Sequence, residues 1–284
     1  MSAPLTVACV QVNAGPELQP NLEAAGLWVR RARDAGAAFI ALPENVGVMV
    51  HGREKILARA RPEAEHPGMA FFAALAQETG AWLMAGTLAV LRGDGRVANR
   101  ANLFAPDGRR VAFYDKIHMF DVDLPGGESY RESATFQPGE RAVVAATPWG
   151  GLGMTICYDV RFAALFRTLA QQGVRLITVP AAFTVPTGRA HWHVLLRARA
   201  IETGAFILAP AQVGTHDEGR QTFGHAVIID PWGEVLADAG GDAPGFITAT
   251  LNLERVEEVR AMVPALRHDR AYTLAAMSES APPA

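Results

Sequence analysis

The sequence alternates short apolar runs, typical of buried strands, with longer segments whose apolar residues recur at helical spacing. In chain order the expected elements are β-α-β-α-β-β-β, followed by β-β-α-β-α-β-β-β-β-α. Helical crossovers produce parallel strand pairs, whereas hairpins produce antiparallel ones. The two halves are similar in order, so the pattern predicts an α/β fold with two layered, mixed sheets and helices on the outside.

The expected elements are short and are separated by turn sequences rich in glycine and proline. Asn21 is the expected N-cap of the first helix and Gly36 its end. We expect loops at residues 121–137 and 181–188. The expected strands are residues 5–12, 38–42, 82–85, 97–105, 109–114, 142–146, 152–156, 176–180, 206–210, 223–230, 234–237 and 245–251, and the expected helices are 21–35, 69–79, 162–172, 191–202 and 253–262.

The 284 residues contain no short-period repeat and no linker. We therefore expect a single domain over residues 1–276, followed by a small, polar, flexible tail at residues 277–284. The net charge of −3 provides no basic surface for nucleic acid, so no nucleic-acid partner is expected.

No run of 18 apolar residues is present, so we expect no membrane-spanning helix and no membrane partner. The first 13 residues lack the basic and apolar regions of a signal peptide. Two cysteines, Cys9 and Cys157, are too few for a disulfide framework and suit a reducing compartment. We therefore expect a cytoplasmic protein.

Three polar residues stand at the ends of apolar strands: Glu44, Lys116 and Cys157. Each alone has an ordinary explanation, a solvated charge for Glu44 or Lys116 and an inert buried thiol for Cys157. Together they would supply a nucleophile, a carboxylate that takes its proton and a cation that stabilises an oxyanion. Cys157 also lies between a strand and a helix, where ligands gather in α/β sheets and the helix dipole favours a thiolate.

Other chemistries have weaker support. No Gly-x-Ser-x-Gly motif is present for a serine hydrolase. His191 and His193 could serve a cysteine–histidine pair, although packing or a surface position explains His193 equally well. The eight histidines are scattered without metal-ligand spacing, and no glycine-rich motif joins a strand to a helix. No metal or nucleotide site is therefore expected.

Three motifs together resemble the signatures of the nitrilase superfamily of carbon–nitrogen hydrolases. They are Leu42-Pro43-Glu44, Tyr114-Asp115-Lys116-Ile117-His118 and Ile156-Cys157-Tyr158-Asp159-Val160-Arg161-Phe162. They occur in the family's order, and the similarity covers residues 5–268. The resemblance implies a four-layer α-β-β-α sandwich and an enzyme that cleaves a carbon–nitrogen amide bond.

The resemblance implies a role for each matching residue. Glu44 would be the general base, Lys116 the cation that stabilises the oxyanion and Cys157 the nucleophile that forms a thioester. The backbone N–H of Tyr158 would complete the oxyanion site. Glu128 falls where the superfamily often has a second glutamate, although it could instead be a solvated loop carboxylate. No metal or organic cofactor is implied.

The loop and helix start that follow the strand at residues 176–180 are expected to form the pocket wall. We expect Phe183, Thr184, His191 and Trp192 to lie there. This expectation rests on their position after a strand end and on the family resemblance.

Further segments resemble one branch, the deaminated-glutathione amidases and their ω-amidase neighbours. The branch implies a small 2-oxo acid amide with a free carboxylate as substrate. Ala163-Ala164-Leu165 departs from the more usual Pro-Glu-Leu of the family. The segments that carry the resemblance are residues 120–126, 190–192, 195–203, 211–214, 224–225, 230–233 and 268–270, together with His216, Glu218, Arg220 and Pro264.

Several alternatives remain open at this stage. An ω-amidase acting on 2-oxoglutaramate, a nitrilase and an N-carbamoyl amino acid amidohydrolase are alternatives within the family. A non-catalytic interaction protein with the same fold is an alternative from another class. Loss of Glu44, Lys116 or Cys157 would favour it, and all three are present. A glutamine-amidase subunit would normally serve a synthetase, and this chain contains no synthetase domain. Members of the family usually pair, so the resemblance implies a homodimer or a higher homo-oligomer, with residues 162–170 and 191–202 as candidates for the interface.

Overall fold

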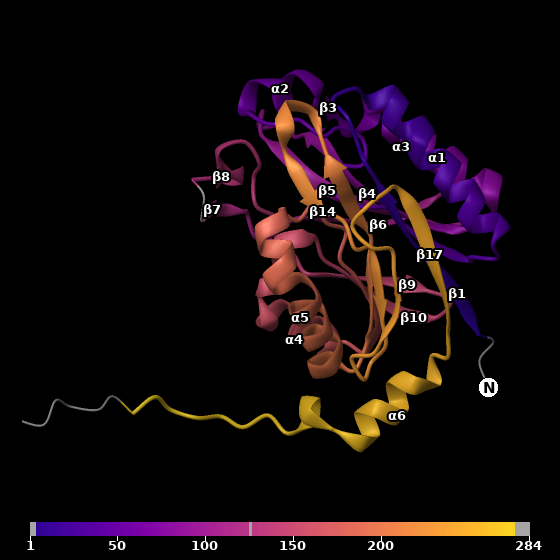
Figure 1. Cartoon of the computed structure of the whole chain (residues 1–284). Helices are drawn as coiled ribbons and strands as arrows, with labels where there is room; N and C mark the ends of the chain where they lie inside the picture. Colours follow the sequence, from indigo (N-terminus) through magenta and orange to yellow (C-terminus); the bar gives the residue numbers. More distant parts are fainter. Residues whose placement is uncertain (1–3, 125–126, 276–284) are drawn as a thin grey trace, which may run out of the picture.

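The computed structural model describes residues 4–124 and 127–275, and two mixed sheets pack against each other at its centre (Figure 1). Within these residues the first sheet has the order β14-β13-β1-β2-β4-β5-β6, with β17 also beside β1 and β3 beside β4. Its strands are β1 (Leu5–Val12), β2 (Phe39–Ala41), β3 (Arg61–Pro62), β4 (Trp82–Leu91), β5 (Val97–Phe104), β6 (Arg110–Asp115), β13 (Ala211–Thr215), β14 (Gln221–Phe223) and β17 (Gly245–Leu251).

The second sheet has the order β16-β15-β12-β11-β10-β9. Parallel pairs lie in the middle of each sheet and antiparallel hairpins at the edges. The strands of the second sheet are β9 (Val143–Thr147), β10 (Gly150–Met154), β11 (Val174–Thr178), β12 (Phe206–Ala209), β15 (Val227–Ile229) and β16 (Val235–Asp238), and a separate hairpin is formed by β7 (Asp121–Asp123) and β8 (Ser129–Arg131).

Helices cover the outer face of each sheet, which gives the four-layer α-β-β-α sandwich (Figure 1). Helices α1 (Leu18–Asp34) and α3 (Pro67–Thr79) pack on the first sheet, and α4 (Ala163–Gln171) and α5 (Val185–Thr203) on the second. None of the helices in the described part of the chain combines the length and apolarity needed to cross a membrane. The remaining helical segments are α2 (Arg53–Arg59), α6 (Glu254–Met262) and the 3₁₀ turns η1 (Glu63–Glu65), η2 (Glu132–Ala134), η3 (Cys157–Arg161), η4 (Asp217–Gly219) and η5 (Ala265–Arg267).

Strand β1 shows why the inner strands are apolar throughout. Successive side chains of a strand point to opposite faces of the sheet. Val7 and Cys9 belong to the core between the two sheets, whereas Ala8 and Val10 pack beneath α1 and α3. Both faces of the strand are therefore buried, which favours apolar residues on each.

The first and the last strand of the described residues are neighbours in the first sheet. β1 pairs antiparallel with β17 over seven residues, from Leu5 opposite Leu251 to Gln11 opposite Gly245. The last strand in the sequence thus lies directly beside the first, as Figure 1 shows.

Most expected elements are present, but several boundaries were wrong. Helix α1 begins at Leu18, so Asn21 is inside the helix, where its side chain bonds the backbone of Gly15 and Gly47. The expected loop at residues 121–137 contains the β7–β8 hairpin and η2. The helix expected at 191–202 begins at Val185. The sequence pattern also missed α2, β3, β13 and β14.

The expectation of a single domain over residues 1–276 stays a prediction. The tail at residues 277–284 and the loop residues Pro125 and Gly126 lie outside the described residues.

Candidate active site

Cys157 lies in a sharp turn between β10 and α4. Its φ angle is +47°, a left-handed conformation that non-glycine residues rarely adopt and that often marks a functional site. The backbone N–H of Cys157 donates to the carbonyl oxygen of Pro180 at 2.9 Å, which holds the turn against the neighbouring strand end. The turn therefore fixes the position of the thiol relative to the second sheet.

Glu44 follows β2 in the first sheet and is only 3% exposed. Its Oε1 atom accepts hydrogen bonds from Lys116 Nζ and Asn99 Nδ2, each at 2.9 Å. Its Oε2 atom accepts from the backbone N–H of Ala182 at 3.0 Å. The carboxylate is thus desolvated and held by three donors, as a buried charge requires.

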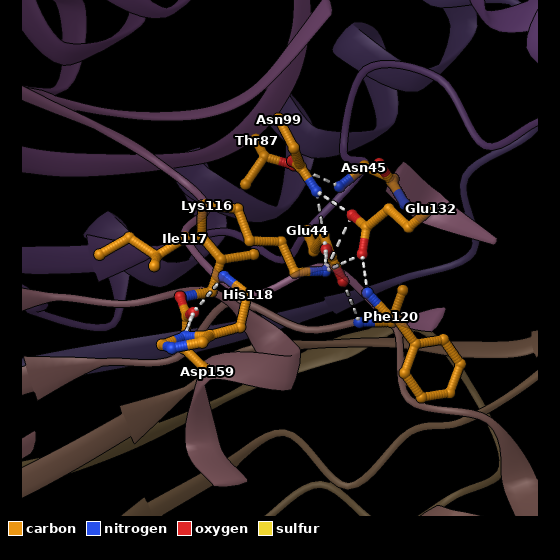
Figure 2. A network of polar contacts seen from close by, with 12 residues as sticks. Glu44, Asn45, Thr87, Asn99, Lys116, Ile117, His118, Phe120, Glu132 and Asp159 are labelled. Atoms are coloured by element: carbon orange, nitrogen blue, oxygen red, sulfur yellow. Dashed lines mark hydrogen bonds and ion pairs between the residues drawn. The ribbon is translucent and has the colours of Figure 1, made fainter. Parts of the chain in front are cut away.

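Lys116 follows β6 and is 2% exposed. Its ammonium lies between two carboxylates, with Nζ 2.9 Å from Glu44 Oε1 and 2.8 Å from Glu132 Oε2 (Figure 2). The second oxygen of Glu132 is 3.0 Å from Nζ. An ammonium fixed in this way can stabilise negative charge that develops beside it without rearrangement.

The second glutamate at the site is Glu132, and the expectation for Glu128 was wrong. Glu128 is exposed before β8, and its carboxylate accepts a hydrogen bond from the Tyr130 hydroxyl at 2.9 Å. Glu132 comes after the hairpin, where the chain has turned back toward Lys116, and it also accepts from the Phe120 N–H at 2.7 Å. Reading residues 121–137 as one irregular loop concealed this reversal of the chain.

The backbone around Glu44 depends on a close approach at Gly86. A Cβ atom at this position would lie 2.1 Å from the Pro43 carbonyl oxygen, and the φ angle of Gly86 is +62°. The register of β4 shifts between Met84 and Thr87, and the Thr87 N–H then donates to the Pro43 carbonyl oxygen at 3.3 Å. The irregularity in β4 therefore accommodates the turn that carries Glu44.

Glu44 and Lys116 each favour the charged form of the other, whereas the thiol of Cys157 is kept neutral. Burial favours a raised pKa for Glu44, but the Lys116 ammonium and hydrogen bonds from Lys116, Cys157 and Asn99 outweigh it and hold the pKa below its ordinary value. Burial opposes the charge on Lys116, but Glu132 and Glu44 raise its pKa well above normal. Burial and then the Glu44 charge raise the pKa of the Cys157 thiol well above normal, against the effect of Lys116. At neutral pH the site therefore holds a neutral thiol beside a carboxylate and an ammonium.

These groups face a cavity of about 360 Å³, within the usual range for small-molecule sites. Tyr158, Phe183 and Thr184 line it together with the three charged or reactive residues. His191 does not: it is exposed on α5, and its ring lies 3.3 Å from the Arg161 guanidinium. The expectation that His191 forms the pocket wall was wrong because α5 starts earlier than expected.

Trp192, the other residue expected at the pocket wall, is fully buried. Its indole N–H donates to the His225 carbonyl oxygen at 2.9 Å, and its ring packs 4.7 Å from that of Phe183. Trp192 therefore packs against Phe183, which lines the cavity, and does not line the cavity itself.

One group of potential metal ligands converges elsewhere in the described residues: His193, His225 and Asp238, whose ligand atoms lie within 4.8 Å of one another. The Asp238 carboxylate accepts hydrogen bonds from His193 Nε2 at 2.7 Å and from His225 Nδ1 at 2.9 Å. The cluster thus satisfies its own hydrogen bonds, and none of its members lines the cavity beside Cys157.

Residues 6–261 match the carbon-nitrogen hydrolase family, and the chain belongs to that family. It is an amide-hydrolysing enzyme, which agrees with the pocket that brings Cys157, Glu44 and Lys116 together.

Two relatives and one solved structure are similar to this chain over most of its length. The chain is 43% identical over 270 residues to a deaminated glutathione amidase of Synechocystis, covering 93% of this chain and 98% of the relative. It is 33% identical over 283 residues to an omega-amidase of Xenopus tropicalis, covering 98% and 99%. Among solved structures it resembles the NitFhit protein of C. elegans, with a TM-score of 0.86 and 32% identity, covering 94% of this chain and 65% of that longer one.

Proposed function

We propose that this enzyme hydrolyses deaminated glutathione or a closely similar 2-oxo acid amide that carries a free carboxylate. The observation that carries the proposal is the buried arrangement of Glu44, Lys116 and Glu132 beside Cys157, in a chain 43% identical to a deaminated glutathione amidase. The arrangement supplies a nucleophile, a base and an oxyanion-stabilising cation without a cofactor.

In the proposed first step, Cys157 Sγ attacks the amide carbon while Glu44 takes the thiol proton. Proton transfer in the free enzyme would be uphill, because the pKa of Cys157 is raised and that of Glu44 is lowered. A free thiolate therefore does not accumulate, and in the proposed step the proton moves to Glu44 as the C–S bond forms. The oxyanion that forms on the amide oxygen is stabilised by Lys116 and by the backbone N–H of Tyr158.

The tetrahedral intermediate then collapses. Protonated Glu44 gives its proton to the leaving nitrogen, the C–N bond breaks and a thioester on Cys157 remains. Glu44 next takes a proton from a water molecule that attacks the thioester, and that proton returns to the Cys157 sulfur as the acid product leaves. We assign Glu132 the role of positioning Lys116 throughout, because both oxygens of its carboxylate accept hydrogen bonds from Lys116 Nζ.

The proposal is tested by incubating the purified protein with deaminated glutathione and measuring release of 2-oxoglutarate. We expect turnover by the wild type and none by Cys157→Ala, with folding of the variant confirmed by its melting temperature. No turnover by the wild type would contradict the substrate, and near-native turnover by Cys157→Ala would contradict the mechanism.

An ω-amidase acting on 2-oxoglutaramate is the second candidate, supported by the 33% identity to the Xenopus tropicalis enzyme over nearly the whole chain. The two substrates share their acyl group and differ in the leaving amine, which is cysteinylglycine in one and ammonia in the other. Ammonia release from 2-oxoglutaramate, without turnover of deaminated glutathione, would favour the ω-amidase.

We also propose that the enzyme forms a homodimer through the exposed face of α5. Val194 is 67% exposed and Ile201 is 56% exposed on this helix, and seven residues of separation place them on one face. Trp232, 51% exposed, adds to the apolar surface nearby. Such a surface is typical of an interface. A cytoplasmic location is proposed because Cys9 and Cys157 are both free thiols.

A further inference from the structure

Arg220 has an unsatisfied donor in the wall of the active-site cavity. Its Nε–H is buried and has no hydrogen-bond partner among the described residues. Its Nη2 donates to the Ala182 carbonyl oxygen at 3.2 Å, and the Ala182 N–H donates to Glu44. A buried donor without a partner costs free energy, and a bound ligand that accepts a hydrogen bond from this N–H would remove that cost.

Arg220 also lies where the catalytic cavity continues outward. It lines both the cavity that contains Cys157 and a second, more open cavity of about 480 Å³. His51 and Tyr130 line both cavities as well, and the Arg220 guanidinium stacks 5.4 Å from the Tyr130 ring. The guanidinium is therefore placed beside the path of any part of a substrate that extends outward from the reacting carbon.

The charge of Arg220 is not neutralised by a neighbouring carboxylate. Three other arginines line the cavity. Arg59 is paired with Glu17 at 3.0 Å and Arg131 with Asp123 at 2.9 Å, whereas Arg53 donates to the Ala134 carbonyl oxygen at 2.8 Å. Arg220 forms no such ion pair with any described carboxylate, and after burial its charge is the next cause that lowers the pKa of His51. A carboxylate is the group that best matches a planar, unpaired guanidinium.

We propose that Arg220 binds a carboxylate carried by the leaving amine of the substrate and so selects long amides over simple primary amides. This inference rests on the proposed function. In deaminated glutathione the carboxylate is that of the glycine in the cysteinylglycine half, which 2-oxoglutaramate lacks. Arg220 would touch the part of the substrate that leaves first and take no part in proton transfer.

The test compares Arg220→Met with wild type on the two substrates, which share the 2-oxoglutaryl group and both release 2-oxoglutarate. We expect kcat/KM for deaminated glutathione to fall about 10- to 100-fold, mainly through KM, and that for 2-oxoglutaramate to change less than about twofold. Arg220→Lys should recover part of the loss. Arg109→Met is the control, because Arg109 is an exposed arginine in the β5–β6 turn, outside both cavities.

A third substrate identifies the group that Arg220 binds. Deaminated glutathione with its terminal carboxylate converted to an amide should be hydrolysed equally by wild type and Arg220→Met. Equal losses on deaminated glutathione and 2-oxoglutaramate would overturn the inference, because Arg220 would then serve the shared acyl half. Unchanged kinetics on every substrate would overturn it as well. If the wild type fails on deaminated glutathione, the proposed function itself fails.

Discussion

The Tyr114 hydroxyl donates a 2.7 Å hydrogen bond to the Asp159 carboxylate, and this bond connects the two sheets beside the active site. Tyr114 comes two residues before Lys116, and Asp159 comes two residues after Cys157. Asp159 is fully buried and also accepts from the N–H groups of Ile156 at 2.8 Å and His118 at 3.1 Å. The separation of the cation from the nucleophile is therefore set by hydrogen bonds between their neighbours.

Removing this hydrogen bond should weaken the contact between the two sheets beside the active site. We expect Tyr114→Phe to lower the free energy of unfolding by about 1–3 kcal/mol, because the buried Asp159 Oδ2 atom keeps the Ile156 N–H but loses the other of its two donors, and to lower kcat with little change in KM. Urea unfolding and steady-state kinetics measure the two effects. Tyr272→Phe, at a residue 92% exposed, should change neither. Equal stability of the two variants would contradict the prediction.

Glu132 and Glu128 provide a matched pair four residues apart. Glu132→Gln should reduce kcat by about 100-fold, because one of the two charges that hold the Lys116 ammonium is lost. Glu128→Gln should retain nearly full activity, since Tyr130, near the surface, is the one described residue whose side chain its carboxylate bonds. Initial-rate measurements compare the two variants. A larger loss of activity in Glu128→Gln would assign the positioning of Lys116 to Glu128 in place of Glu132.

Glu44→Gln should abolish turnover and yet make the thiol more acidic. Burial and then the negative charge of Glu44 raise the pKa of Cys157, so loss of that charge lowers this pKa. We expect the midpoint for alkylation of Cys157 by iodoacetamide to move to lower pH in the variant. Labelling rates across a pH series measure it, with Cys157→Ala as the blank. A midpoint that moves upward would contradict the electrostatic account.

Gly80 and Gly86 have nearly equal φ angles, so alanine substitutions at the two positions distinguish the cost of backbone strain from the cost of steric contact. A methyl group added at Gly80, where φ is +61°, would meet no atom within 4 Å, whereas at Gly86 it would lie 2.1 Å from the Pro43 oxygen. Gly80→Ala should therefore cost about 1 kcal/mol of stability, and Gly86→Ala at least about 2 kcal/mol more. Gly86→Ala should also reduce turnover, because Glu44 is displaced. Thermal unfolding and kinetics of both variants provide the comparison.

The proposed dimer predicts the effect of a charge on α5. Ile201→Asp should convert the protein to monomers, measured by light scattering after gel filtration, because a buried carboxylate without a partner is unfavourable. Leu27→Asp, at an exposed leucine 46% accessible on α1, should leave the mass unchanged. A wild type that is already monomeric, or an Ile201→Asp variant that stays dimeric, would contradict the proposed interface.

Sequence reasoning succeeded where burial imposes a simple pattern. Apolar runs identified β2, β6 and β10, and the polar residue after each end stood out: Glu44, Lys116 and Cys157, which line one cavity. β17 was predicted with its observed bounds, because turn sequences separate it from its neighbours.

It failed where polar side chains act through tertiary contacts. Glu132 and Asn99 come from segments whose local sequence gives no sign that they meet at Lys116 and Glu44. The strands β7 and β8 have three residues each, too few for a period to be visible. Pro186 looked like a loop residue, although proline is favoured in the first turn of a helix, where α5 begins.

The pairing of β1 with β17 makes the sheet that carries Glu44 and Lys116 depend on the last strand of the described residues. Glu44 and Lys116 belong to the first sheet and Cys157 to the second, so neither sheet alone contains both the thiol and its base. The first sheet is itself incomplete until Leu251 has taken its place beside Leu5. We therefore expect a chain truncated before β17 to have an incomplete first sheet, which is the sheet that carries Glu44 and Lys116, and to be inactive for that reason.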